Sequence, residues 1–238
     1  MITAVAVVLP ARDEAPSIPG CLHAIRRSLR RLPVSVERTV VLVADRCTDD
    51  TADRARSSAE VVVSHAPLTI GELRDLGCRT ALSRLTGHRA SEVLLLNTDA
   101  DSEVDQHWAA RHLARAQHGG HATTGPAHLI GPPPGGPGAA ARYRKLVETA
   151  DREAGNVYGA NLAVRADAYT AVGGFGRIAT GEDHSLWRRL ENAGYRLAQE
   201  PGALVRTSAR LDGRAPGGLS ALLRTLAVGS SPAMGGPT

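Results

Sequence analysis

Aromatic residues are scarce in this sequence of 238 residues, where they make up 3% of the chain. Proteins that bind single-stranded nucleic acid stack the bases on aromatic rings, so this scarcity argues against that function. Cysteine is rare as well. Cys21, Cys47 and Cys78 are odd in number and form no Cys-x-x-Cys pair. This usage argues against a disulfide scaffold and predicts a reducing, cytoplasmic setting.

Long hydrophobic runs are also lacking. No apolar segment approaches the ~20 residues that cross a bilayer, and the N-terminus has no basic-then-apolar signal pattern, so we expect no transmembrane segment. The formal net charge of +4 comes from arginines spread along the chain. Spread in this way they predict no nucleic-acid patch, but they favour anionic ligands and leave open a peripheral contact with an anionic membrane.

Strands and helices alternate in the first half of the sequence. Apolar runs rich in β-branched residues predict strands, and segments with apolar residues at helical spacing predict helices. The predicted elements are strand 2–9, helix 17–32, strand 39–44, a short helix to about 56, strand 60–64, helix 72–85 and strand 93–97. This order predicts an α/β fold with a mostly parallel sheet flanked by helices.

The second half is less regular. It combines predicted helices over about 105–118, 140–154 and 185–192 with a strand over 122–129 and short strands within 159–165, 195–199 and 203–207. Residues 131–138 contain only Pro and Gly and predict a loop. Residues 228–238 are small and rich in Pro and Gly, which predicts a disordered tail.

Acidic residues follow several of the predicted strands. Asp45 ends the second strand, Asp99 and Asp101 follow the strand over 93–97, and Glu182 and Asp183 open a helix. Ligands of open α/β sheets bind outside the carboxyl ends of such strands. Mg²⁺ and Mn²⁺ prefer oxygen ligands and complete their shells with water and phosphate, so Asp-Ala-Asp suits a metal–diphosphate site. An Asp-x-Asp after a strand is also common as a solvated turn or a helix cap.

Six segments, in this order, resemble the sequence blocks of family 2 glycosyltransferases. They are Val7–Glu14, Val43–Thr51, Asn97–Ser102, Gly159–Arg165, Val172–Phe175 and Gly181–Leu190. The resemblance runs from about residue 2 to 227 and implies the GT-A fold, in which a central mostly parallel sheet is flanked by helices. It implies one domain over 1–227, with a nucleotide-sugar-binding half to about 101 and an acceptor half from about 102.

The resemblance also implies roles on the donor side. The nucleotide-sugar would be bound by Pro10, Ala11, Glu14, Asp45, Arg74 and Asp99. Asp101, together with Asp99, would hold Mn²⁺ or Mg²⁺. The block around Arg74 departs from the family pattern, because Asp75 stands where Asn is usual. The donor would be a UDP-, GDP- or dTDP-sugar.

On the acceptor side, the resemblance implies that Asp183 is the general base, with Glu182 beside it. Asn161 and Trp187 would frame the pocket for a hydroxyl-bearing acceptor, although Trp187 equally suits the core. Arg210 and Arg214 lie in a Gly-containing segment that resembles the mobile segment closing over the diphosphate. A solvated basic loop is the alternative there.

The expected activity is therefore the transfer of a single sugar with inversion. The Gln-x-x-Arg-Trp block of processive polymer synthases is absent from the sequence. A dehydrogenase or methyltransferase would need a Gly-rich turn after the first strand, and residues 10–14 contain no glycine. A nucleotidyltransferase and a catalytically degenerate nucleotide-binding module remain alternatives, and the intact Asp99, Asp101 and Asp183 argue against the degenerate module.

Overall fold

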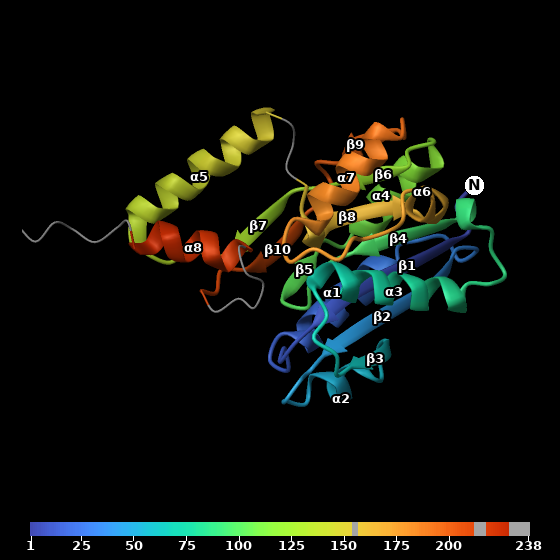
Figure 1. Cartoon of the computed structure of the whole chain (residues 1–238), viewed down its shortest axis with the longest axis horizontal. Coiled ribbons are helices and arrows are strands. Elements are labelled where there is room, and N and C mark those ends of the chain that lie inside the picture. The colour runs from blue at the N-terminus through green and yellow to red at the C-terminus, as the bar shows by residue number, and fades with distance from the viewer. Residues whose placement is uncertain (154–156, 212–217, 229–238) are drawn as a thin grey trace, which may run out of the picture. The chain divides into compact units, whose positions relative to one another are not determined.

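The computed structural model describes residues 1–153, 157–211 and 218–228 (Figure 1). It divides into two compact units, each built from two stretches of chain. Unit 1 comprises Met1–His128 and Val157–Thr207, and unit 2 comprises Leu129–Asn156 and Ser208–Thr238. From residue 229 onward the predicted tail lies outside the described residues.

A seven-stranded sheet forms the centre of unit 1, in the order β3-β2-β1-β4-β8-β6-β9. Its strands are β1 (Ala4–Ala11), β2 (Glu37–Asp45), β3 (Glu60–Ser64), β4 (Val93–Asn97), β6 (Ala122–Thr124), β8 (Leu162–Arg165) and β9 (Leu197–Gln199). The first four are mutually parallel, which confirms the predicted α/β arrangement. β8 runs antiparallel to β4 and β6. The sheet therefore takes strands from both predicted halves of the chain.

Helices cover both faces of this sheet, as the sequence of β1 requires. All residues of β1 are buried, and they alternate between two hydrophobic clusters. The helices α1 (Ile18–Leu29) and α4 (Trp108–Gln117) contribute to the hydrophobic cluster that contains Val5 and Val7. The helices α3 (Ile70–Arg84), α6 (Ala166–Ala171) and α7 (Glu182–Asn192) contribute to the hydrophobic cluster that contains Ala6 and Val8.

Two helices of unit 1 begin earlier than predicted. α3 begins at Ile70 because Thr69 and Glu72 form a capping box: the Thr69 N–H donates to Glu72 Oε2 at 2.9 Å, and Thr69 Oγ1 accepts from the Glu72 N–H at 3.3 Å. α7 begins at Glu182 rather than at residue 185, directly after Gly181, which has a φ of 76°. Its two acids thus lie in the first helical turn. The short helix α2 (Thr51–Ala55) and the 3₁₀ turns η1 (Ala90–Glu92) and η2 (Gly159–Asn161) complete this group.

The predicted strand over 122–129 is two strands in different sheets. β6 ends at Thr124, and β7 (Ala127–Ile130) belongs to a three-stranded sheet of order β5-β10-β7. Gly125 and Pro126 separate them, because Pro cannot continue a ladder and a Cβ at Gly125 would lie 2.2 Å from the Ala203 carbonyl oxygen. The strand β5 (Ser102–Val104), not predicted from the sequence, pairs antiparallel with β10 (Val205–Ser208).

The described part of unit 2 contains two helices. α5 (Gly136–Glu153) begins inside the predicted Pro/Gly loop, where Pro137 suits the first helical turn. α8 (Leu219–Val228) was not predicted. It buries Ser220, Leu223 and Leu226, and the Arg142 guanidinium of α5 donates to the Leu226 carbonyl. Within the described ranges, no helix combines the length and the apolarity needed to cross a membrane.

Candidate active site

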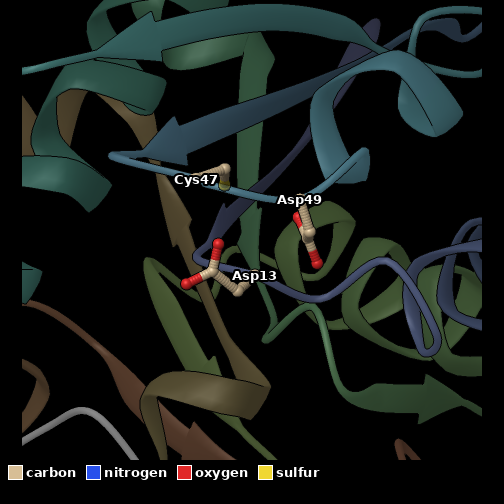
Figure 2. Close-up of side chains that lie close together, drawn as sticks. All are labelled: Asp13, Cys47 and Asp49. Atoms are coloured by element: carbon tan, nitrogen blue, oxygen red, sulfur yellow. The ribbon is translucent and has the colours of Figure 1, made fainter.

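The loops that follow β1 and β2 are held together by two carboxylates. Asp13 Oδ1 accepts hydrogen bonds from Thr48 N–H at 2.6 Å and from Thr48 Oγ1 at 3.0 Å. Asp49 Oδ2 accepts from the Ala15 N–H at 3.0 Å. Figure 2 shows Asp13 facing the segment that carries Cys47 and Asp49. Asp13 has a φ of 49°, a left-handed conformation that Asp tolerates better than most residues. These contacts fix the shape of the edge of the sheet beside Asp45.

The same three side chains have the composition of a small metal site. One ligand atom each from Asp13, Cys47 and Asp49 lies within 4.8 Å of the others. Both carboxylates, however, already accept hydrogen bonds from the opposite loop. Cys47 donates its thiol proton to the Ala11 carbonyl oxygen at 3.5 Å, and burial raises the pKa of that thiol. A protonated thiol is a poor metal ligand. These residues are therefore better explained as hydrogen-bonded links between the two loops than as a metal centre.

The residues predicted to bind the nucleotide line this edge. Pro10 and Ala11 are the last two residues of β1, and Asp45 is the last residue of β2. The Asp45 carboxylate is 6% exposed and pairs with Arg46 at 3.0 Å and with Arg12 at 3.8 Å. Glu14 is also buried, and its N–H donates to Thr51 Oγ1 at 2.7 Å.

The segment that follows β4 contacts α1, because the Cys21 thiol donates to the Asp99 carbonyl oxygen at 3.4 Å. Burial raises the pKa of the Cys21 thiol, and the negative charges of Asp101, Asp99 and Glu14 raise it further. The Asp99 side chain is 35% exposed, and that of Asp101 is partly buried. Thr98 Oγ1 and Ser102 Oγ, on either side of the motif, have no protein partner among the described residues. Buried hydroxyls in this state are commonly completed by water or ligand, which fits a site for a hydrated cation.

Arg74 connects this motif to α7. Its guanidinium is 3% exposed and donates from Nη2 to Asp99 Oδ1 at 2.6 Å and from Nε to Glu182 Oε1 at 3.2 Å. A longer contact of 3.4 Å joins Nη1 to the Thr98 carbonyl oxygen. Burial alone would lower the pKa of Arg74, but the charges of Asp99 and Glu182 outweigh it and keep the pKa above its ordinary value. Two separate acidic segments thus share one buried cation.

The two acids of α7 have different surroundings. Glu182 is buried and pairs with Arg74; burial raises its pKa, and the Arg74 charge opposes that change. Asp183 is half-buried, and its carboxylate is oriented by two backbone donors. The Gly159 N–H donates to Oδ2 at 2.7 Å, and the His184 N–H donates to Oδ1 at 2.7 Å. Of the two, Asp183 is the acid that faces solvent.

Asn161, predicted to frame the acceptor pocket, lies inside the protein. Its side chain has no exposed surface, and Oδ1 accepts from Trp108 Nε1 at 2.8 Å and from His112 Nε2 at 3.0 Å. Its Nδ2 donates to the carbonyl oxygens of Pro126 and Ala203, at 2.8 and 2.6 Å. The structure thus gives this side chain an internal role. No signal in the sequence singled out its partners on α4.

The remaining predicted site residues are Trp187, Arg210 and Arg214. Trp187 is partly buried and packs against the hydrophobic cluster on the α3 side of the sheet. Arg210 belongs to unit 2, where its N–H donates to Ser208 Oγ at 3.3 Å. Arg214 lies outside the described residues.

No family model matches the sequence, and no curated protein matches it significantly. Solved structures with low sequence identity do share its fold. A mannosyltransferase from Pyrobaculum calidifontis, solved with GDP-Man and Mn²⁺, is 18% identical with a TM-score of 0.65, and the match covers 94% of this chain and 68% of that one.

Two further solved structures also share the fold of this chain. GalNAc-T7, solved with UDP, GalNAc and Mn²⁺, is 14% identical with a TM-score of 0.64, and the match covers 89% of this chain and 45% of that one. Residues 1–349 of TarS from S. aureus, solved with UDP-GlcNAc, are 15% identical with a TM-score of 0.60; the match covers 96% of this chain and 66% of that one. The fold of this chain is therefore the GT-A fold of glycosyltransferases, as the resemblance predicted.

Proposed function

We propose that this protein is an inverting glycosyltransferase that moves one sugar from a nucleoside-diphosphate sugar to an acceptor hydroxyl. The observation that carries the proposal is the pairing of Arg74 with both Asp99 and Glu182, at 2.6 and 3.2 Å. This pairing puts the Asp-Ala-Asp motif and the start of α7, distant in sequence, into one cluster beside the carboxyl ends of parallel strands. In such a reaction the donor site and the general base must lie next to each other.

The donor half of the site uses the edge formed by β1, β2 and β4. Pro10, Ala11, Glu14 and Asp45 would contact the nucleotide. Asp101, assisted by Asp99, would hold Mn²⁺ or Mg²⁺, since carboxylate oxygens are the ligands these cations prefer. Such a cation, when bound, stabilises the negative charge that the leaving nucleoside diphosphate gains.

Asp183 accepts the proton of the acceptor hydroxyl. The acceptor oxygen attacks the anomeric carbon from the face opposite the diphosphate and forms the new glycosidic bond. The bond from the anomeric carbon to the diphosphate oxygen breaks, and its electron pair leaves with the nucleoside diphosphate, so the anomeric configuration inverts. The backbone N–H groups of Gly159 and His184 orient the carboxylate for this role. Glu182 is engaged with Arg74 and positions the helix rather than acting as the base.

The acceptor half takes in the surroundings of α7. Trp187 would flank the acceptor, and Asn161 would act indirectly, by holding the η2 turn that supplies the Gly159 N–H. We also propose a cytoplasmic location, on the basis of the three free cysteine thiols.

A panel of UDP-, GDP- and dTDP-sugars tests the proposal. We expect release of nucleoside diphosphate with one donor in the presence of Mn²⁺ or Mg²⁺, and none with EDTA. Water serves as the acceptor until a hydroxyl acceptor is found, and proton NMR of the first-formed sugar reports its anomeric configuration. Release of pyrophosphate from a nucleoside triphosphate and a sugar phosphate would instead indicate a nucleotidyltransferase. Nucleotide binding without any turnover would indicate a degenerate binding module.

A further inference from the structure

The guanidinium of Arg74 is buried and already engaged with protein oxygens. Its side chain is 3% exposed, and each of its three nitrogens donates to a protein oxygen, on Glu182, Thr98 or Asp99. The resemblance implied that this arginine binds the donor. In this structure its donors are instead directed at the two segments that carry the acids of the site.

Two glycines make room for this arrangement. A Cβ at Gly159 would lie 2.8 Å from Arg74 Nη2 and 3.2 Å from Glu182 Oε1. A Cβ at Gly71, in the first turn of α3, would lie 2.1 Å from the Gly176 carbonyl oxygen and 3.2 Å from Glu182 Cβ. Both distances at each position are shorter than ordinary van der Waals contact, so a side chain at Gly159 would displace Arg74 or Glu182, and one at Gly71 would collide with the Gly176 backbone.

The Gly159 N–H is also the group that orients Asp183, at 2.7 Å from Oδ2. The backbone that leaves space for the guanidinium therefore also holds the proposed base. On the other side, Nη2 holds Asp99 at 2.6 Å, two residues before Asp101. One buried cation thus lies between the group that would receive the proton and the loop that would hold the leaving diphosphate.

We infer that Arg74 is a positioning residue that sets the placement of the Asp99–Asp101 loop relative to Asp183, and that it does not bind the nucleotide. This inference rests on the proposed glycosyl transfer. The planar fork of an arginine is suited to the role, because it bonds two carboxylates in different directions at once. A lysine would supply the same charge but not the same geometry.

Arg74→Lys is the first test. We expect a folded protein whose kcat for transfer falls by ~10–100-fold, because a misplacement of about 1 Å between reacting groups is enough for such a loss. The Kd of the nucleoside diphosphate with Mn²⁺, measured by calorimetry, should change by less than ~3-fold, as should the donor KM. A weakened Kd and KM with an unchanged kcat would show that Arg74 contacts the nucleotide, and would overturn the inference.

The double variant Arg74→Met with Glu182→Gln tests whether a loss of activity in an Arg74 variant comes from misfolding alone. It removes the cation together with its more buried partner, so its melting temperature should exceed that of Arg74→Met alone, while kcat stays low because the link is missing. Recovery of the wild-type kcat in the double variant would mean that Arg74 only neutralises charge, which contradicts a positioning role. Arg84→Gln is the matched control, since Arg84 lies on the same helix, is 63% exposed and pairs with Glu60; its kcat and Kd should equal those of the wild type.

The outcomes separate the two proposals. If the wild-type protein transfers no sugar from any donor in the panel, the proposed function fails and this inference fails with it. If the wild type transfers sugar and Arg74→Lys matches it in kcat, only the inference fails.

Discussion

At the scale of single residues, the division of roles among the acids follows from exposure and from charge partners. Glu182 is buried against Arg74, whereas Asp183 is half-buried and held by two backbone N–H groups. Asp99 gives one oxygen to Arg74. Glu182 and Asp99 thus share the buried cation of Arg74, and Asp183 and Asp101 are the acids that we propose for proton transfer and for metal binding.

Asp183→Asn should lower the rate of transfer by at least ~10²-fold, because the amide keeps the size of the side chain but cannot accept the proton. Nucleotide affinity and melting temperature should hardly change. Steady-state kinetics, calorimetry and thermal unfolding on the same preparation check this. Asp53→Asn, at an exposed position of α2, is the control and should behave as the wild type in all three. A folded Asp183→Asn protein with a normal rate would remove Asp183 from the mechanism.

Asp101→Ala should abolish the dependence of nucleotide binding on metal. In the wild type we expect Mn²⁺ to tighten the binding of the nucleoside diphosphate, since a hard cation bridges carboxylate and phosphate oxygens. Calorimetric titrations with Mn²⁺ and with EDTA give the comparison. Equal affinity in both proteins, with or without the cation, would exclude Asp101 as a metal ligand.

At the scale of elements, the depth of α3 against the sheet decides where Arg74 lies. Gly77 follows Arg74 by three residues and so falls on nearly the same face of the helix. A Cβ there would lie 2.4 Å from Val8 Cγ1 and 3.1 Å from Val43 Cγ2, so α3 rests directly on β1 and β2. This close approach brings the guanidinium down to the level of the strand ends.

Gly77→Ala should therefore destabilise the protein, although Ala is the better helix former by ~1 kcal/mol. Overpacking of this kind typically costs about 1–3 kcal/mol, measured as a lower free energy of unfolding in denaturant. Gly87→Ala is the control, because no atom lies within 4 Å of the new Cβ. Equal stability of the two variants would show that α3 can shift away from the sheet without loss.

At the scale of the whole molecule, a buried polar network fixes the irregular half of unit 1. Asn161 bonds Trp108 and His112 of α4 and the carbonyl oxygens of Pro126 and Ala203, while His112 Nδ1 lies 2.7 Å from Thr123 Oγ1. Because Asn161 Oδ1 can only accept, His112 Nε2 is its donor and Nδ1 accepts from the Thr123 hydroxyl. Burial lowers the pKa of His112 to about 4.

This network makes global stability depend on pH. His112 takes up a proton near pH 6.5 when the chain is unfolded but only near pH 4 when it is folded, so acidification favours the unfolded state in that window. We expect a loss of about 2 kcal/mol between pH 7.5 and pH 5 from this residue alone. His112→Gln should be less stable at pH 7.5 but should lose less stability on acidification. Denaturant unfolding at both pH values measures the difference, and an equal loss in the two proteins would contradict the assignment.

The sequence by itself determined the parallel half of the sheet and most of the candidate site. The strands ending at Ala11, Asp45 and Asn97 are neighbours, because continuous aliphatic runs can be buried only within a sheet covered on both faces. The acids at their ends could be read from their position after each run. This local pattern is a property of the chain, independent of its packing.

Only the tertiary structure decided the partners of those residues. β5 and β10 are too short for periodicity to reveal, and they form by pairing with each other across the chain. α8 is ten residues long and buries one face in unit 2. Its own sequence could not predict that burial. Arg74 and Asn161 carried no local sign that their side chains would be buried. Charge and amide groups are buried only where partners from distant segments satisfy them, and that condition exists only in the folded chain.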